Sequence, residues 1–254
     1  MSTNEKPKLS GVPETMLQTV YARAKETKTR GAIKDTKAVQ LVDKIDYDFS
    51  LADKDPPMHS GVVARTIVLD KLVKKYLAKN KGAVVVNIAC GLDTRCYRMS
   101  GYEHWYNLDL PETIGVRKKL LPEEGKISQI AMSAMDDWGG EIAEQDTPVI
   151  VIIEGLTMYL SEEDVKKIFS IISKRFERVT VLVERKGQEA YPVIVISNGC
   201  VDAQPFFSFD VDAEAGINER ANFAEIRKIL EATSDPEEQK ELLRQNHDVL
   251  ISRT

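Results

Sequence analysis

The feature that most constrains this chain is the apolar run Val84–Ala89, which changes abruptly into the short polar loop Cys90–Arg95. An apolar run followed at once by small and polar residues is typical of a buried parallel strand that leads into a tight turn and a helix. In doubly wound sheets, ligands bind at the carboxyl ends of such strands. The segment therefore predicts an α/β fold with a ligand site close to Gly91.

Strand-like and helix-like segments alternate through the middle of the chain. This alternation indicates a mostly parallel sheet with right-handed crossovers and helices on both faces. We expect strands over residues 84–89, 105–109, 127–132, 149–154 and 179–184. We expect helices from Pro57 to about residue 79, directly after Asp93, over 111–121 and, with an N-cap at Ser161, up to residue 176.

The two ends of the chain are organised differently from its middle. Residues 13–46 read as two short helices that break near Gly31, and residues 46–57 as a turn-rich loop. We expect residues 1–57 to form a helical lid and residues 58–254 to form the ligand-binding α/β domain. After residue 186 the alternation weakens, and the candidate elements are strands at 193–196, 206–211 and 249–252 and helices at 218–232 and 236–246.

Composition excludes several classes of function. The formal net charge is −5 and no basic stripe is visible, so the chain is a poor candidate for nucleic-acid binding. No apolar run is long enough to cross a bilayer, and residues 1–10 contain no apolar signal segment, so we expect no membrane partner. The three cysteines lack a disulfide or zinc spacing, which favours the cytoplasm, and the three histidines are too scattered to suggest a metal site.

Arg65 stands out within the helix predicted from Pro57, because its neighbours at spacings of three and four residues are apolar. These neighbours are Gly61, Val62, Val68 and Leu69. The charged face of the helix is expected elsewhere, at Asp70, Lys71, Lys74 and Lys75. An arginine on an apolar face must reach water or an anion, so spacing alone favours equally a buried ion pair with a protein carboxylate and a contact with a ligand carboxylate.

Acidic residues near the predicted strand ends suggest contacts with a nucleotide-like ligand. Asp109 ends the second strand, 18 residues after Gly91. A carboxylate at about this spacing can accept hydrogen bonds from ribose hydroxyls, and the combination with Gly91 favours that role over an ordinary loop carboxylate. Asp93 is placed to cap the helix that follows it.

Glu154 directly follows the five apolar residues of the fourth strand, so we expect it to point into the crevice at the carboxyl edge of the sheet. A capping role is less consistent with the sequence, because Ser161 already serves the next helix. Asp136 and Asp137 follow the third strand and are in reach of an adenine amino group, although their spacing alone favours solvated loop charges.

These residues, in this order, resemble the leucine carboxyl methyltransferase family, which includes bacterial O-methyltransferases of polyketide tailoring. The resemblance runs from about Lys34 to Glu184 and does not extend beyond about residue 186. Its motifs are Ala-Arg65-Thr, Asn-Ile-Ala-Cys-Gly91-Leu-Asp93-Thr-Arg95-Cys-Tyr-Arg98, Asn-Leu-Asp109-Leu-Pro111 and Ile-Ile-Glu154-Gly-Leu-Thr-Met-Tyr159-Leu.

The resemblance implies a class I, Rossmann-like S-adenosylmethionine-dependent methyltransferase fold. It implies that Arg65 binds the methionine carboxylate of S-adenosyl-L-methionine and that Gly91 lies under it. Asp109 would hold the ribose hydroxyls, and Glu154 would lie near the cofactor's amino group. The family's glycine two residues before Gly91 is Ala89 here. The cofactor-binding residues that we expect are Arg65, Ala89, Gly91, Asp93, Arg95, Asp109, Leu110, Ala134, Met135, Asp136 (a displaced substitute for the family's adenine-contacting acid) and Glu154.

The first hypothesis is an O-methyltransferase that acts on a carboxylate or hydroxyl of a small-molecule acceptor. A carboxylate has a pKa of about 4 and is already ionised at neutral pH, so it needs alignment and partial desolvation rather than a general base. A hydroxyl acceptor needs a base. His59 and Tyr159 are the nearest candidates for one, and the motifs supply no obvious catalytic residue.

Three alternatives stay open at the level of sequence. A close variant is methylation of a protein C-terminal carboxylate. Ala89 and the unfamiliar last third of the chain motivate a non-catalytic cofactor-binding or regulatory protein on the same fold. A nicotinamide-dependent oxidoreductase is compatible with Asp109, but the G-x-G-x-x-G fingerprint is missing. The sequence leaves the acceptor and the oligomeric state open.

Overall fold

The computed structural model of the chain describes residues 14–123, 125–144, 146–184, 193–197 and 200–202. The chain divides into two compact units, residues 1–208 and 209–254, and all of the described residues belong to the first unit. Among these residues no helix is both long and apolar enough to span a membrane. The predicted division into a lid over 1–57 and a domain over 58–254 stays a prediction.

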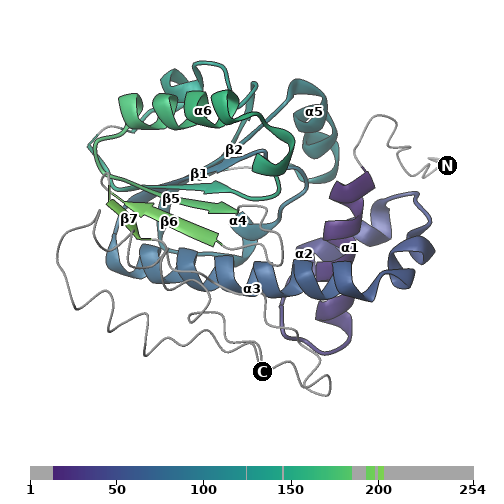
Figure 1. Cartoon of the computed structure of the whole chain (residues 1–254). Coiled ribbons are helices and arrows are strands. Elements are labelled where there is room, and N and C mark those ends of the chain that lie inside the picture. The colour runs from purple at the N-terminus through teal and green to yellow at the C-terminus, as the bar shows by residue number, and fades with distance from the viewer. Residues whose placement is uncertain (1–13, 124, 145, 185–192, 198–199, 203–254) are drawn as a thin grey trace, which may run out of the picture. The chain divides into compact units, whose positions relative to one another are not determined.

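The described strands form one sheet in the order β3-β2-β1-β4-β5-β6-β7 (Figure 1). The first five strands in the chain pair in parallel, whereas β6 and β7 pair antiparallel. Their bounds are β1 Ala83–Ile88, β2 Tyr102–Asp109, β3 Ile127–Ala131, β4 Val149–Ile153, β5 Val179–Glu184, β6 Val193–Ser197 and β7 Cys200–Asp202. The predicted doubly wound α/β fold is therefore confirmed.

Helices surround this sheet and connect its strands. The α-helices are α1 Glu14–Lys28, α2 Thr36–Lys44, α3 Pro56–Lys79, α4 Arg95–Arg98, α5 Pro111–Leu120 and α6 Glu162–Arg175. Short 3₁₀-helices are η1 Phe49–Lys54, η2 Trp138–Glu141 and η3 Thr157–Tyr159. The predicted N-cap of α6 is confirmed, because the Ser161 hydroxyl accepts from the backbone N–H of Asp164 while the Asp164 carboxylate accepts from that of Ser161.

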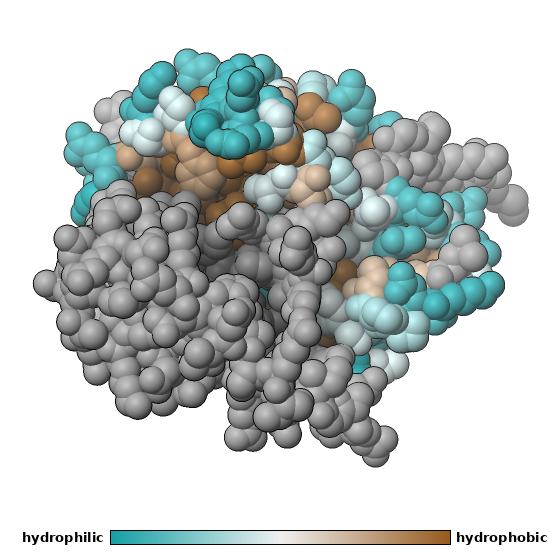
Figure 2. Space-filling model, viewed as in Figure 1, coloured by the Kyte–Doolittle hydropathy of each residue, from teal (hydrophilic) through white to brown (hydrophobic). Residues whose placement is uncertain are grey.

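The two faces of the sheet carry separate hydrophobic clusters. In Figure 1, α6 runs above the sheet and α3 below it. Ile168 and Ile172 of α6 pack with Val151 on one face, and Leu69 and Val73 of α3 pack with the opposite face. Figure 2 shows hydrophilic residues along the outer side of α6 and hydrophobic residues beneath it. Every residue of β1 is buried, as expected for a central parallel strand that is covered on both faces.

The N-terminal helices are part of the packed structure. Helix α1 packs on α2 and on α3. Leu17 and Val20 of α1 share a buried cluster with Leu41 of α2 and with Leu92, which lies in the loop after β1. Helix α1 therefore packs on the loop at the carboxyl end of β1, although α2 and α3 lie between them in the sequence.

Several sequence-based expectations need correction. The segment 46–57 is not only a loop, because Asp48 accepts a hydrogen bond from the backbone N–H of Ser50 and starts η1. Strand β2 begins at Tyr102 rather than Trp105, because its first residues pair with β1. Strand β1 ends at Ile88, since Ala89 has a φ of 53° and leaves the extended conformation.

The C-terminal predictions are tested only in part. The candidate strand at 193–196 is confirmed as β6, and β7 was not predicted. The candidate elements at 206–211, 218–232, 236–246 and 249–252 lie outside the described residues.

The burial of β4 leads to a prediction for a substitution that shortens one of its side chains. Ile152 is fully buried between β1 and β5, so Ile152→Ala should lower the free energy of unfolding by about 2–5 kcal/mol, through lost burial and a cavity. Urea denaturation measures this change. The matched control is Ser173→Ala on the exposed side of α6, for which we expect a change below about 0.5 kcal/mol. Equal effects of the two substitutions would contradict the described core.

Candidate functional site

The candidate site lies where β1 and β4 adjoin. The chain passes from β1 to β2 in one direction across the sheet and from β4 to β5 in the other. Ligands of doubly wound sheets bind at the carboxyl ends of strands at such a switch point. Gly91 follows β1 and Glu154 follows β4, so the topology brings together two residues that sequence analysis had selected separately.

The loop after β1 is a tight turn with left-handed backbone. Ala89 has a φ of 53° and Gly91 a φ of 48°. Residues with a Cβ atom rarely adopt this conformation, so a glycine would fit the position of Ala89 with less strain. A Cβ atom at Gly91 would lie 2.7 Å from Sδ of Met16 in α1, so a side chain there would displace Met16.

Asp109 ties the end of β2 to this loop. Its carboxylate accepts hydrogen bonds from the backbone N–H of Gly91 at 2.8 Å and from that of Leu110 at 2.7 Å. Burial raises the pKa of Asp109, and the two N–H groups offset only part of this effect. Leu110 itself is 50% exposed.

Arg65 reaches the same edge of the sheet from α3. Its Nε donates to Glu154 at 2.8 Å and its Nη1 donates to Glu184 at 2.6 Å. Of the two alternatives that spacing left open for Arg65, the ion pair with protein carboxylates is present. Glu184, at the end of β5, was missed by the sequence analysis. The signal was the one that identified Glu154, an acidic residue directly after an apolar run.

Arg95 is the most completely enclosed of the four arginines Arg23, Arg65, Arg95 and Arg98. Its side chain is only 1% exposed. Its Nε donates to Asp70, its Nη1 to Asp93 and its Nη2 to Glu154, at 2.8, 2.7 and 2.9 Å. Each of its three nitrogens therefore fixes one carboxylate. Asp70 was expected on the charged face of α3, and this was wrong, because Arg95 and Arg98 of α4 donate to its carboxylate.

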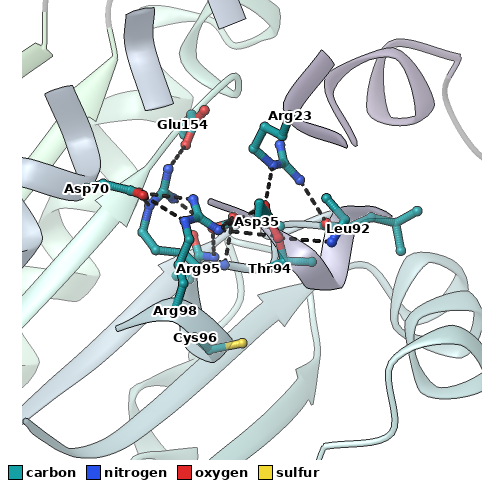
Figure 3. A network of polar contacts seen from close by, with 12 residues as sticks. Arg23, Asp35, Asp70, Leu92, Thr94, Arg95, Cys96, Arg98 and Glu154 are labelled. Carbon is teal, nitrogen blue, oxygen red and sulfur yellow. Dashed lines mark hydrogen bonds and ion pairs between the residues drawn. The ribbon is translucent and has the colours of Figure 1, made fainter. Parts of the chain in front are cut away.

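The network continues toward the N-terminal helices (Figure 3). Arg98 bridges Asp70 and Asp35, and Asp35 also accepts from Nε of Arg23 at 3.1 Å and from the hydroxyl of Thr94 at 2.5 Å. The Nη2 of Arg23 donates to the carbonyl oxygen of Leu92.

Ion pairs thus link four guanidinium groups and five carboxylates, with a formal net charge of −1. Their members are Arg23, Arg65, Arg95 and Arg98, and Asp35, Asp70, Asp93, Glu154 and Glu184.

The carboxylates of the network differ in acidity. Burial opposes ionisation of Asp93 and Glu154, but the neighbouring guanidinium groups more than offset it, so that the pKa of each lies below its ordinary value. Arg95 contributes most to both shifts. At Glu184 burial dominates over the attraction of Arg65 and raises the pKa.

The remaining predicted residues lie at the end of β3. The backbone N–H of Met132 donates to the carbonyl oxygen of Asp109, so this loop adjoins the end of β2. Ala134 and Met135 pack partly against the core under α6, and Asp136 is exposed and accepts from the backbone N–H of Ser133. They take no part in the charge network.

Comparison with known proteins identifies similar sequences. A family profile described as leucine carboxyl methyltransferase matches residues 16–173. The tetracenomycin polyketide synthesis O-methyltransferase TcmP of Streptomyces glaucescens is 38% identical over 164 residues, which are 62% of this chain and 59% of TcmP. The S-adenosyl-L-methionine-dependent methyltransferase dpfgK of Gibberella zeae is 32% identical over 195 residues, 69% of this chain and 65% of dpfgK. The chain thus spans about three fifths of the length of these curated relatives.

A solved structure is also similar, at a greater distance. It is the N-methyltransferase NodS from Bradyrhizobium japonicum in complex with S-adenosyl-L-homocysteine, at 12% identity and a TM-score of 0.37, covering 57% of this chain and 70% of NodS. The fold of this chain is defined by its own strand order.

Removal of Arg95 should destabilise the protein strongly. Arg95→Ala removes one buried partner from each of three carboxylates, which should lower the free energy of unfolding by about 3–5 kcal/mol in urea denaturation. Lys166→Ala, which breaks an exposed pair with Glu162, serves as control and should cost less than about 1 kcal/mol. A loss below about 1 kcal/mol in Arg95→Ala would show that the described network contributes little.

The lowered pKa of Asp93 predicts a pH dependence of stability. Asp93 contributes stability above its unfolded-state pKa of about 3.9, and this contribution is lost as the pH falls through the lower folded-state value. The difference in free energy of unfolding between wild type and Asp93→Asn should therefore be largest near pH 7 and shrink below pH of about 4. A difference that stays constant over this range would contradict the pKa shift.

Proposed function

Because the chain belongs to the leucine carboxyl methyltransferase family, we propose that it is an S-adenosyl-L-methionine-dependent O-methyltransferase that methylates a small-molecule acceptor. The observation that carries the proposal is the gathering of Arg65, Gly91, Asp109 and Glu154 at the carboxyl ends of β1, β2 and β4. A class I methyltransferase fold is consistent with the strand order around these residues.

The residues present fit the amino-acid end of S-adenosylmethionine. Two nitrogens of Arg65 are held by Glu154 and Glu184, and no partner among the described residues engages its Nη2. With 17% of its side chain exposed, Arg65 would use this nitrogen to bind the methionine carboxylate. Glu154, whose pKa is lowered, would hold the ammonium group as an ionised carboxylate.

The nucleoside end would extend across the ends of β2 and β3. The carboxylate of Asp109 accepts from two backbone N–H groups and from the side chain of Thr113, and its position at the end of β2 would let it also accept from a ribose hydroxyl. We assign the adenine side to the exposed Leu110 and to the loop with Ala134, Met135 and Asp136. Gly91 and Ala89, in the loop after β1, would lie directly beneath the bound cofactor.

Asp93 and Arg95 have a different part in this proposal. Both are engaged with protein groups, since Arg95 donates to three carboxylates and Asp93 accepts from Asn87 and Arg95. They would hold Glu154 and the loop in place.

S-Adenosylmethionine supplies an electrophilic methyl group on a sulfonium centre. The chain's own residues would bind and orient it and exclude water from the path of the acceptor. His59 lies 3.5 Å from Glu26 and outside the charge network, and Tyr159 is 69% exposed. Because neither residue belongs to the charge network at the ends of β1 and β4, we favour a carboxylate acceptor, which is ionised without a base.

The setting of the enzyme is part of the proposal. The buried thiols of Cys90 and Cys96 are free, in keeping with the cytoplasm. We expect a small-molecule partner rather than nucleic acid or a membrane, and the N-terminal helices would cover the site, as supported by the contact of Met16 with the loop at Gly91.

Calorimetric titration with S-adenosylmethionine tests the proposal. We expect micromolar binding to the wild type and a loss of affinity of about 10- to 100-fold in Arg65→Ala, because a charge-assisted hydrogen bond to the carboxylate is removed. Lys126→Ala, which breaks an exposed pair with Glu103, is the control and should leave binding unchanged.

The outcomes separate the open alternatives. No heat and no thermal shift with the wild type would overturn the methyltransferase proposal. Binding followed by no transfer to a broad panel of small acids and hydroxyl compounds would favour a non-catalytic cofactor-binding protein. Binding of NADH instead would favour the oxidoreductase alternative.

A further inference from the structure

We propose that Glu184 is a positioning residue of the cofactor site, which holds Arg65 and the loop after β4 in the arrangement that binds the amino-acid end of S-adenosylmethionine. This inference rests on the proposed function. It concerns a residue that touches three separate segments of the site and that lies beyond the conspicuous motifs of the sequence.

The contacts of Glu184 connect these segments directly. Its Oε1 accepts from Nη1 of Arg65 in α3 at 2.6 Å, and its Oε2 accepts from the backbone N–H of Gly155 at 2.7 Å. Its backbone carbonyl accepts from the hydroxyl of Thr157 in η3 at 2.6 Å. One residue at the end of β5 therefore fixes both the arginine and the segment that follows Glu154.

Burial excludes a direct role in contacting a ligand. The side chain of Glu184 is 0% exposed, whereas those of Arg65 and Glu154 are 17% and 14% exposed. A carboxylate this deeply buried is tolerated only with its oxygens satisfied, and here a guanidinium and a backbone N–H do so. Glu184 thus acts through Arg65 and Gly155.

The geometry of a guanidinium makes this action specific. The group is planar, so fixing Nε on Glu154 and Nη1 on Glu184 also fixes the direction of Nη2. With Glu154 alone, Arg65 would keep one anchor and could turn about it. We therefore expect Glu184 to determine whether Nη2 points at the methionine carboxylate.

The loop after β4 depends on the same residue. Gly155 has a φ of 70°, in the left-handed region, and its N–H is directed at Glu184. This turn immediately follows Glu154, which we propose as the partner of the cofactor's ammonium group. Loss of Glu184 would therefore loosen both groups that bind the amino-acid end and neither of those that bind the nucleoside.

A pair of ligands distinguishes this role from a general structural one. S-Adenosylhomocysteine carries the amino-acid end, whereas 5′-methylthioadenosine lacks it and keeps the nucleoside. In Glu184→Ala we expect the affinity for S-adenosylhomocysteine to fall about tenfold or more, and that for 5′-methylthioadenosine to change less than about twofold. Glu103→Gln, at an exposed ion pair, is the control and should change neither.

A double-mutant cycle makes the test sharper. If Glu184 acts through Arg65, then Glu184→Ala in an Arg65→Ala background should cause a much smaller further loss of affinity for S-adenosylhomocysteine than in the wild type. Should Glu184→Ala fail to fold, as judged by circular dichroism, Glu184→Gln supplies the same comparison, because Arg65 and Gly155 donate to different oxygens of Glu184 and an amide replaces one of these oxygens by an NH2 donor.

The outcomes are distinct. Selective loss for S-adenosylhomocysteine supports the proposal. Three results would overturn it and leave the proposed function standing, provided that the wild type binds S-adenosylhomocysteine. They are an equal loss of affinity for both ligands in Glu184→Ala, full additivity in the double-mutant cycle, and an unchanged affinity of Glu184→Ala for S-adenosylhomocysteine. A folded wild type that binds neither ligand would overturn the proposed function itself and this inference with it.

Discussion

The structure around the candidate site depends on one constraint, the burial of carboxylates at the carboxyl edge of a parallel sheet. Glu154 and Glu184 end apolar strands, and burial alone would raise the pKa of each. Arg95 lies between Glu154 and the carboxylates of Asp93 and Asp70, and its attraction outweighs burial at Glu154. The carboxylates of Asp93 and Glu154 can therefore stay ionised although they are buried at this edge of the sheet.

The elements outside the sheet contribute to this balance. Helix α3 supplies Arg65 and Asp70, and the N-terminal segment supplies Arg23 and Asp35, which reach the loop after β1. The N-terminal helices also pack on that loop through the buried cluster that contains Leu92. The loop after β1 and the N-terminal helices are therefore held together by both apolar packing and hydrogen bonds.

Family membership and geometry support the same function by different routes. The family profile covers residues 16–173 and so contains every member of the network except Glu184. The structure adds Glu184 because β5 lies directly beside β4 in the sheet. A network with a formal charge of −1 suits a cofactor that carries a sulfonium and an ammonium group against a single carboxylate.

The sequence by itself determined the parallel strands and the residues directly after them. An apolar run gives a buried strand, and the residue that ends it must lie at the carboxyl edge, so Gly91, Asp109 and Glu154 could be selected from order alone. Only the tertiary structure decided the partners of Arg65, which are 89 and 119 residues away in the chain. It also turned Asp70 inward, because helical periodicity describes one helix and not the charges that other elements bring to it. The spacing of residues along the sequence describes only one element at a time. The partners of a buried charged side chain, in contrast, come from segments that are distant in the sequence and meet only in the folded protein.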